Sequence, residues 1–123
     1  AATWELIENY EANRHRVALE VYNARALRYP EEAVWKLELG RVLRVFGKFR
    51  EAIGVLQEVT ISQAEYAEAS LEEGECHQLQ RDFSEAIRCY TAARAVCDKS
   101  TPRELRDKIE SRHTRLAEAI REP

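Results

Sequence analysis

The stretch L-G-R-V-L-R-V-F-G-K-F-R-E-A at residues 39–52 has a second copy, E-G-E-C-H-Q-L-Q-R-D-F-S-E-A, at residues 73–86. The two copies share a glycine, an aromatic residue and a Glu-Ala pair, and each shared residue lies 34 positions before its counterpart. The corresponding residues are Gly40 and Gly74, Phe49 and Phe83, and Ala52 and Ala86. A fixed period of this length indicates repeated supersecondary units, which bury their apolar faces by stacking on one another.

This period, with its glycine, aromatic residue and alanine, resembles the tetratricopeptide repeat (TPR) family, whose unit is a helix–turn–helix. The resemblance implies an all-α fold in which helix–turn–helix units stack into a right-handed solenoid. We expect one domain (1–123) with about three units and a C-terminal capping helix. The expected bounds are 1–30 for a degenerate first repeat, 31–62 for the second repeat, 63–99 for the third and 100–123 for the capping helix.

The first thirty residues fit this pattern least well. No glycine marks a turn near residues 13–15, and Arg25 stands where the family usually has alanine. We interpret this segment as a degenerate repeat. The alternative is one long helix from Trp4 to Arg28.

Local signals predict where the later helices begin. Proline suits the first helical position and acidic residues suit the first turn, while Ser, Thr or Asp followed three residues later by glutamate forms a capping box. The signals are Pro30-Glu31-Glu32, Ser62 with Glu65, Asp82 with Glu85, and Thr101-Pro102 with Glu104.

The two repeated glycines lie inside predicted helices, where glycine costs about 1 kcal/mol relative to alanine. We therefore expect Gly40 and Gly74 to lie where the two helices of one repeat approach closely.

The composition is that of an ordinary folded domain, because 45% of the 123 residues are hydrophobic and 33% are charged. A net charge of −3 argues against nucleic acid or an anionic membrane as partner. No apolar run is long enough to span a membrane. The chain begins with Ala1-Ala2 and contains no methionine, so we expect a processed or excised piece with flanking domains outside it.

The three cysteines, Cys76, Cys89 and Cys97, have no paired spacing that would indicate a disulfide framework. We expect them to be buried structural thiols, which places the protein in a reducing compartment, the cytoplasm.

No residue pattern predicts catalysis, a metal site or a cofactor. His77 is adjacent to Cys76, and neighbouring helical residues point about 100° apart, so these two cannot share a metal. The acidic group of Glu72, Glu73 and Glu75 is interpreted as a solvated helix face rather than an acid–base site. We expect a protein that is not an enzyme and uses no metal or cofactor.

The TPR resemblance implies protein–protein recognition, in which the first helices of successive repeats line a concave groove that holds a peptide or helix. The implied groove residues are Val34, Leu37, Glu38, Arg41, Arg44, Val45, Glu68, Leu71, Glu72, Glu75, Gln78 and Leu79. The alternative is that these residues form only a solvated face, on which Arg41 or Arg44 neutralises the neighbouring glutamates.

TPR domains that hold the acidic C-termini of heat-shock chaperones use a clamp of lysine, arginine and asparagine. At those positions this chain has Glu38, Glu68 and Glu72, so we expect no such chaperone carboxylate clamp. The expected partner is another protein that presents basic and apolar side chains. The alternative function is self-association, in which the domain makes a homo-oligomer of a larger protein.

Overall fold

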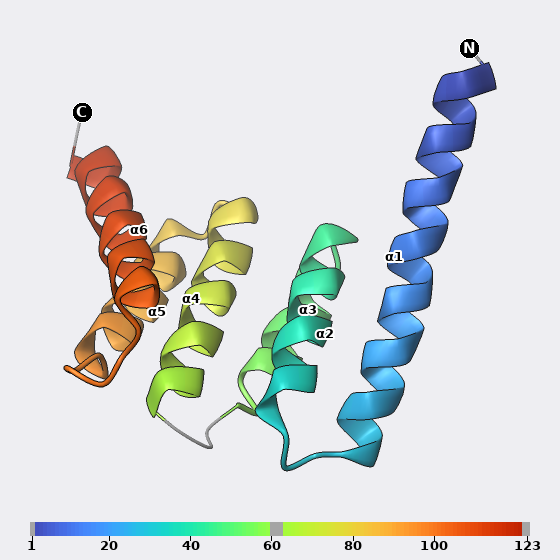
Figure 1. Ribbon diagram of the computed structural model, residues 1–123. Coiled ribbons are helices and arrows are strands. Elements are labelled where there is room, and N and C mark those ends of the chain that lie inside the picture. Colours follow the sequence, from blue (N-terminus) through green and yellow to red (C-terminus); the bar gives the residue numbers. More distant parts are fainter. Residues whose placement is uncertain (1, 60–62, 122–123) are drawn as a thin grey trace.

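Six α-helices make up the regular structure of the described residues, 2–59 and 63–121, in the computed structural model. They are α1 (Ala2–Arg28), α2 (Ala33–Val45), α3 (Phe49–Leu56), α4 (Gln63–Leu79), α5 (Phe83–Ala95) and α6 (Arg103–Arg121). Each helix runs opposite to the one before it (Figure 1). The predicted all-α fold of stacked helical hairpins is confirmed.

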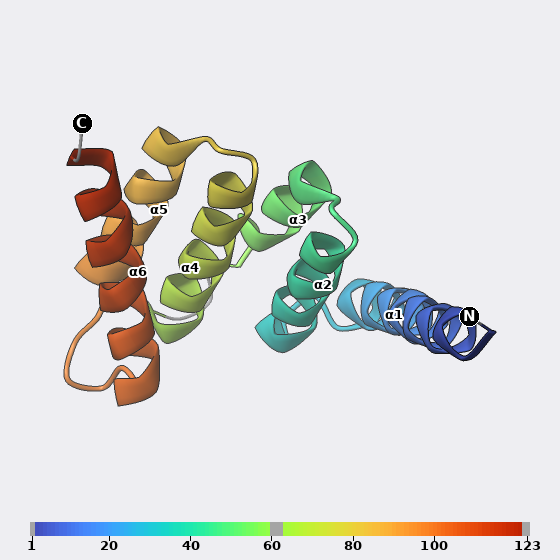
Figure 2. The same cartoon turned by 90° about the horizontal axis from the view of Figure 1, so that it is seen from above.

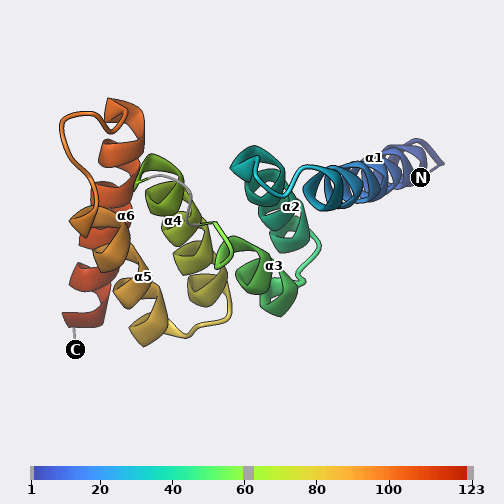
Figure 3. The ribbon, with the colours of Figure 1, turned by 90° about the horizontal axis from the view of Figure 1, so that it is seen from below.

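The two repeats that match best in sequence form two layers. Figure 2 and Figure 3 show α2 and α4 on one side and α3 and α5 on the other. Helix α1 packs along α2, and α6 packs along α5, so these two helices flank the double layer at its ends. In the part of the chain that is described, no helix is long and apolar enough to cross a membrane.

Helix α1 corrects our interpretation of the first thirty residues. Residues 13–15 are helical, so the turn of a degenerate helix–turn–helix is absent and the alternative of one long helix is observed. The physical reason is local, because no glycine or proline occurs between residues 2 and 28 to interrupt the helix.

The connection between α1 and α2 also differs from expectation. Pro30 does not open α2, which begins at Ala33. Instead, the Glu32 backbone N–H donates to the Tyr29 carbonyl at 3.0 Å, which closes a turn with Pro30 at its second position. Proline is favoured at that position because its fixed φ suits the turn.

The remaining start signals have mixed outcomes. Helix α4 begins at Gln63 as predicted, while Ser62 lies outside the described residues. The Asp82 side chain accepts from the Glu85 backbone N–H at 3.4 Å, as expected of a cap. The buried Thr101 hydroxyl accepts from the Asp98 backbone N–H at 3.0 Å, so it closes the loop before α6.

The repeated glycines lie where two helices meet, as predicted. A Cβ atom added to Gly40 would come within 2.6 Å of Leu56 Cδ2 on α3. A Cβ atom added to Gly74 would come within 2.7 Å of Tyr90 Cδ1 on α5. Leu56 and Tyr90 are themselves 34 positions apart, so both partners of the glycine contact repeat with the same period.

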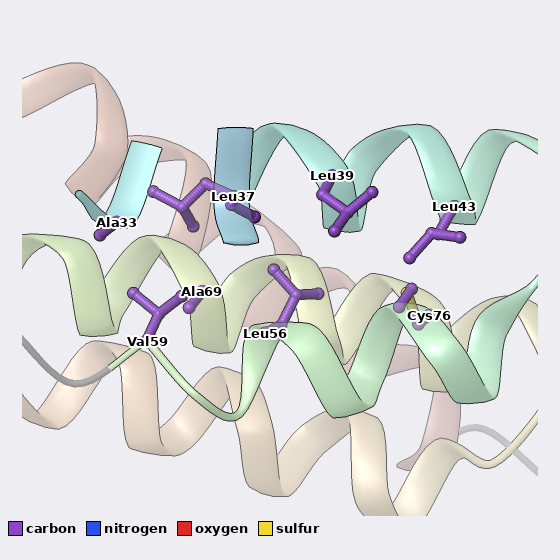
Figure 4. Packing of buried hydrophobic residues seen from close by; sticks show 10 residues of the cluster. Ala33, Leu37, Leu39, Leu43, Leu56, Val59, Ala69 and Cys76 are labelled. Carbon is purple, nitrogen blue, oxygen red and sulfur yellow. The ribbon is translucent and has the colours of Figure 1, made fainter. Parts of the chain in front are cut away.

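The core consists of two clusters. The first lies between α1, α2 and α3 and reaches α4 through Ala69 and Cys76 (Figure 4). The second joins α4, α5 and α6, with Tyr90 and Ile109 at its centre. Both clusters include residues of α4, so the hydrophobic core is continuous from α1 to α6.

Candidate partner-binding groove

Helices α2, α4 and α6 together line a groove of about 280 Å³. Its lining residues are Arg44 from α2, Glu75, Gln78 and Leu79 from α4, and Arg112 and Arg115 from α6. Leu79 is 59% exposed and lines this groove, so it offers an apolar contact to a partner.

Arginines of α2 hold the glutamates of α4 in place. The Arg41 Nε atom donates to Glu72 Oε1 at 3.1 Å, and the same guanidinium also pairs with Glu38 and Glu68. Burial lowers the pKa of Arg41, but the hydrogen bond to Glu72 and the neighbouring carboxylate charges outweigh it and raise this pKa overall. Arg41 therefore stays charged and links two repeats.

The chain of ion pairs continues from α2 to α6. Arg44 pairs with Glu72 at 3.4 Å and also with Glu75. The Arg112 Nε atom on α6 donates to the other oxygen of Glu75 at 3.1 Å. Because a buried carboxylate is costly unless it is paired, these arginines explain how the Glu72 side chain can be only 2% exposed.

The structure distributes the twelve predicted groove residues over three environments. The exposed ones are Val34, Val45, Gln78 and Leu79, and the half-buried ones are Glu38, Arg41, Arg44 and Glu68. The buried ones are Leu37, Leu71, Glu72 and Glu75. Eight of the twelve residues are thus buried or half-buried within the protein, and four remain exposed to a partner.

The acidic group of α4 is not a solvated face, which corrects the sequence interpretation. Glu72, Glu73 and Glu75 are 2%, 8% and 8% exposed. Glu72 and Glu75 face the arginines described above, while Glu73 faces α5 and lies 3.1 Å from Cys89 Sγ. The positive charges that allow Glu72 and Glu75 to be buried come from α2 and α6, so the local sequence of α4 does not reveal them.

Sequence reasoning missed the contribution of α6 to the groove. Arg112 and Arg115 lie outside the repeated stretch, so the repeat register assigns them no position. The arginines of this helix are visible in the sequence, but their pattern alone does not show which other helix they face.

The cysteines behave as structural thiols where they are buried. All three are free; Cys76 and Cys89 are buried and Cys97 is half-buried. Burial raises the pKa of the Cys76 thiol to about 12. Burial, together with the hydrogen bond to Glu73, also raises the pKa of the Cys89 thiol. Reactive cysteines need the opposite shift, since the thiolate is the nucleophile.

The fold is that of an all-α helical-repeat protein. No family model matches the chain, and no curated protein is similar to it in sequence. Among solved structures, it is similar to PcrH in complex with the chaperone-binding region of PopD, with a TM-score of 0.76 and 16% identity over 93% of this chain and 86% of that one.

Two further structures have the same arrangement. One is SycD, a type III secretion translocator chaperone of Yersinia enterocolitica, with a TM-score of 0.77 and 17% identity over 94% of this chain and 81% of SycD. The other is SycD with a peptide of the translocator YopD, with a TM-score of 0.75 and 17% identity over 98% and 96% of the two chains. At these identities the likeness concerns the fold.

The comparison corrects our partner prediction, which separated the chain from chaperones. That prediction was wrong, because SycD, which has a similar fold, is itself a chaperone. The argument from Glu38, Glu68 and Glu72 excluded only the binding of a heat-shock chaperone's acidic C-terminus. It could not exclude a repeat protein that acts as a chaperone itself.

Proposed function

We propose that this chain is a non-catalytic member of the TPR family that binds a segment of a partner protein, in the manner of a chaperone. The segment lies along the face formed by α2, α4 and α6. The observation that carries the proposal is the groove of about 280 Å³ shared by these three helices. The structures of PcrH with a region of PopD and of SycD with a YopD peptide support it, since both have a similar fold.

Apolar contacts with the exposed side chains of the predicted groove supply most of the affinity. Val34, Val45 and Leu79 are 49%, 58% and 59% exposed. Burying such side chains against a partner removes apolar area from water, at about 25 cal/mol per Å². A bound segment therefore presents apolar side chains at a spacing that matches these positions.

The charged floor of the groove serves mainly to fix the shape of the binding face. Its glutamates already have arginine partners, so the face does not require a basic segment. A preorganised surface binds more tightly, because little conformational freedom is lost when the partner arrives.

A matched pair of leucine variants tests the proposal. A partner captured from cell extract is mapped to its binding segment, and a synthetic peptide of that segment is titrated calorimetrically. Leu79→Asp should weaken binding by about tenfold or more, which corresponds to about 1.4 kcal/mol. Leu27→Asp on α1 changes a more exposed leucine, 76% accessible, outside the groove, and should leave binding unaltered. Equal affinities for the two variants would contradict the proposal.

Self-association is a second candidate function, favoured by one observation on α1. Val17 and Val21 lie one helical turn apart and are 49% and 42% exposed. A paired apolar surface of this kind suits helix packing between two copies. Light scattering on the purified chain distinguishes the candidates, because self-association predicts a dimer that Val17→Asp converts to monomer.

A further inference from the structure

Three different metal-ligating side chains meet between α4 and α5, on residues that the partner groove does not use. Glu73 and His77 lie one turn apart on α4, and Cys89 comes from α5. Their ligand atoms all lie within 4.8 Å of one another. The Cys89 Sγ atom is 3.1 Å from Glu73 Oε2, and His77 Nε2 is 3.6 Å from the same oxygen.

The polar groups of this cluster are incompletely satisfied. Glu73 is 8% exposed, and its carboxylate contacts a thiol, which is a weak donor, and an imidazole. The other ring nitrogen of His77, Nδ1, is buried without a hydrogen-bond partner among the described residues. The arginines that neutralise Glu72 and Glu75 come from α2 and α6, and Arg88, which lines the cavity beside Glu73, pairs with Glu85, so this carboxylate favours a further cation.

Space for a further ligand adjoins the cluster. Glu73 and Cys89 line a cavity of about 200 Å³ between α3, α4 and α5, together with Ser70 and Tyr66. A cavity of this size holds several water molecules. A metal held by the three side chains could therefore complete its coordination with water from this cavity.

We propose that Glu73, His77 and Cys89 form a zinc site that fastens α4 to α5. A thiolate, an imidazole and a carboxylate are the side-chain ligands that Zn²⁺ prefers, whereas Mg²⁺ and Ca²⁺ favour oxygen alone. Zinc bond lengths of about 2.0–2.3 Å place tetrahedral ligand atoms about 3.3–3.8 Å apart. The Glu73 oxygen lies 3.1 Å from the Cys89 sulfur and 3.6 Å from the His77 nitrogen, which is close to this range. Binding deprotonates the Cys89 thiol, its proton passes to solvent, and the +2 ion is neutralised by the thiolate and the carboxylate.

This site revises our expectation that the protein has no metal. The sequence argument compared His77 with its neighbour Cys76, which indeed points elsewhere. The cysteine that reaches His77 is Cys89, on the next helix. The site is independent of the proposed function, since partner binding in the groove does not require it.

Cobalt is the probe for the test, because Co²⁺ reports thiolate ligation through a charge-transfer absorption in the near ultraviolet. The purified chain, reduced and freed of metal, is titrated with Co²⁺ and then with Zn²⁺ in competition. We expect one Co²⁺ per chain with the thiolate band, loss of the band when Zn²⁺ is added, and a higher melting temperature with Zn²⁺.

Variants identify the ligands. Cys89→Ser should abolish the thiolate band, and His77→Gln should weaken Co²⁺ affinity by about 100-fold or more, since even indirect partners of a metal contribute about 10–100-fold. Cys97→Ser is the matched control and should keep both the thiolate band and the Co²⁺ affinity of the parent chain. Circular dichroism checks that each variant is folded. Absence of the band in the parent chain, or its persistence in folded Cys89→Ser, would overturn the proposal; so would unchanged affinity in His77→Gln.

Discussion

Gly40 on α2 and Leu56 on α3 face each other so closely that a Cβ atom on the glycine would come within 2.6 Å of the leucine side chain. The same relationship recurs between Gly74 on α4 and Tyr90 on α5. In both cases the missing side chain lets a large residue of the partner helix approach the backbone. The glycine therefore offsets its cost in helix propensity through packing.

The first prediction concerns this contact. Gly40→Leu should lower the free energy of unfolding by about 1–3 kcal/mol or more, because the new side chain overpacks the contact with Leu56. Chemical denaturation followed by circular dichroism measures the change.

Gly54 provides the control for that measurement, since a Cβ atom there would meet nothing within 4 Å. Gly54→Ala should stabilise α3 by about 0.5–1 kcal/mol through helix propensity. If Gly40→Leu melted like the parent protein, the assigned contact would be incorrect.

The second prediction concerns the ion pairs beneath the groove. Arg41→Ala should destabilise the fold by about 1–3 kcal/mol, because it removes a partner from the buried Glu72 carboxylate. Arg88→Ala breaks a pair with Glu85 that is exposed on both sides and should leave the denaturation midpoint unchanged. Equal effects of the two substitutions would show that burial does not strengthen the Arg41 network.

The third prediction concerns the last helix as a cap for the second core cluster. Ile109 is 1% exposed and packs with that cluster, so Ile109→Ala should cost roughly 2–5 kcal/mol. Ile120 lies on the same helix but is 51% exposed, and Ile120→Ala should change stability by less than about 0.5 kcal/mol. Thermal melts of both variants test whether α6 covers the core. Similar small losses of stability in the two variants would contradict that role of α6.

The fourth prediction concerns thiol reactivity in the metal-free protein. Cys97 is half-buried, whereas Cys76 and Cys89 are buried, and burial raises the pKa of all three thiols. At neutral pH, a thiol reagent should modify Cys97 first and reach the other two only after unfolding. Mass spectrometry of partially labelled protein identifies the modified residue. Early labelling of Cys76 would contradict the packing shown in Figure 4.

The repeat register was predictable from sequence because it reflects contacts that recur locally. The copies at residues 39–52 and 73–86 predicted two helical hairpins and the close approach at both glycines. The turn between α2 and α3 contains Gly47, whose φ of 75° is a conformation that favours glycine.

The candidate site was less predictable because its contacts join residues far apart in the chain. From the sequence alone Glu72 is interpreted as a solvated acid, because its partner Arg41 lies 31 positions earlier in the chain. Replacing the α4 glutamates with lysine would place cations against Arg41, Arg44 and Arg112, so it would disturb folding as well as partner binding.

Site-specific photo-cross-linking tests the central claim, that the face of α2, α4 and α6 binds a partner segment. A photoreactive amino acid is introduced at Gln78, an exposed residue of the groove, and separately at Ser84, an exposed residue of α5 outside it. Cross-linked peptides are identified by mass spectrometry in the presence of the captured partner. The account predicts that Gln78 cross-links to one short segment of the partner and that Ser84 does not. Cross-links from Ser84 with none from Gln78 would contradict it.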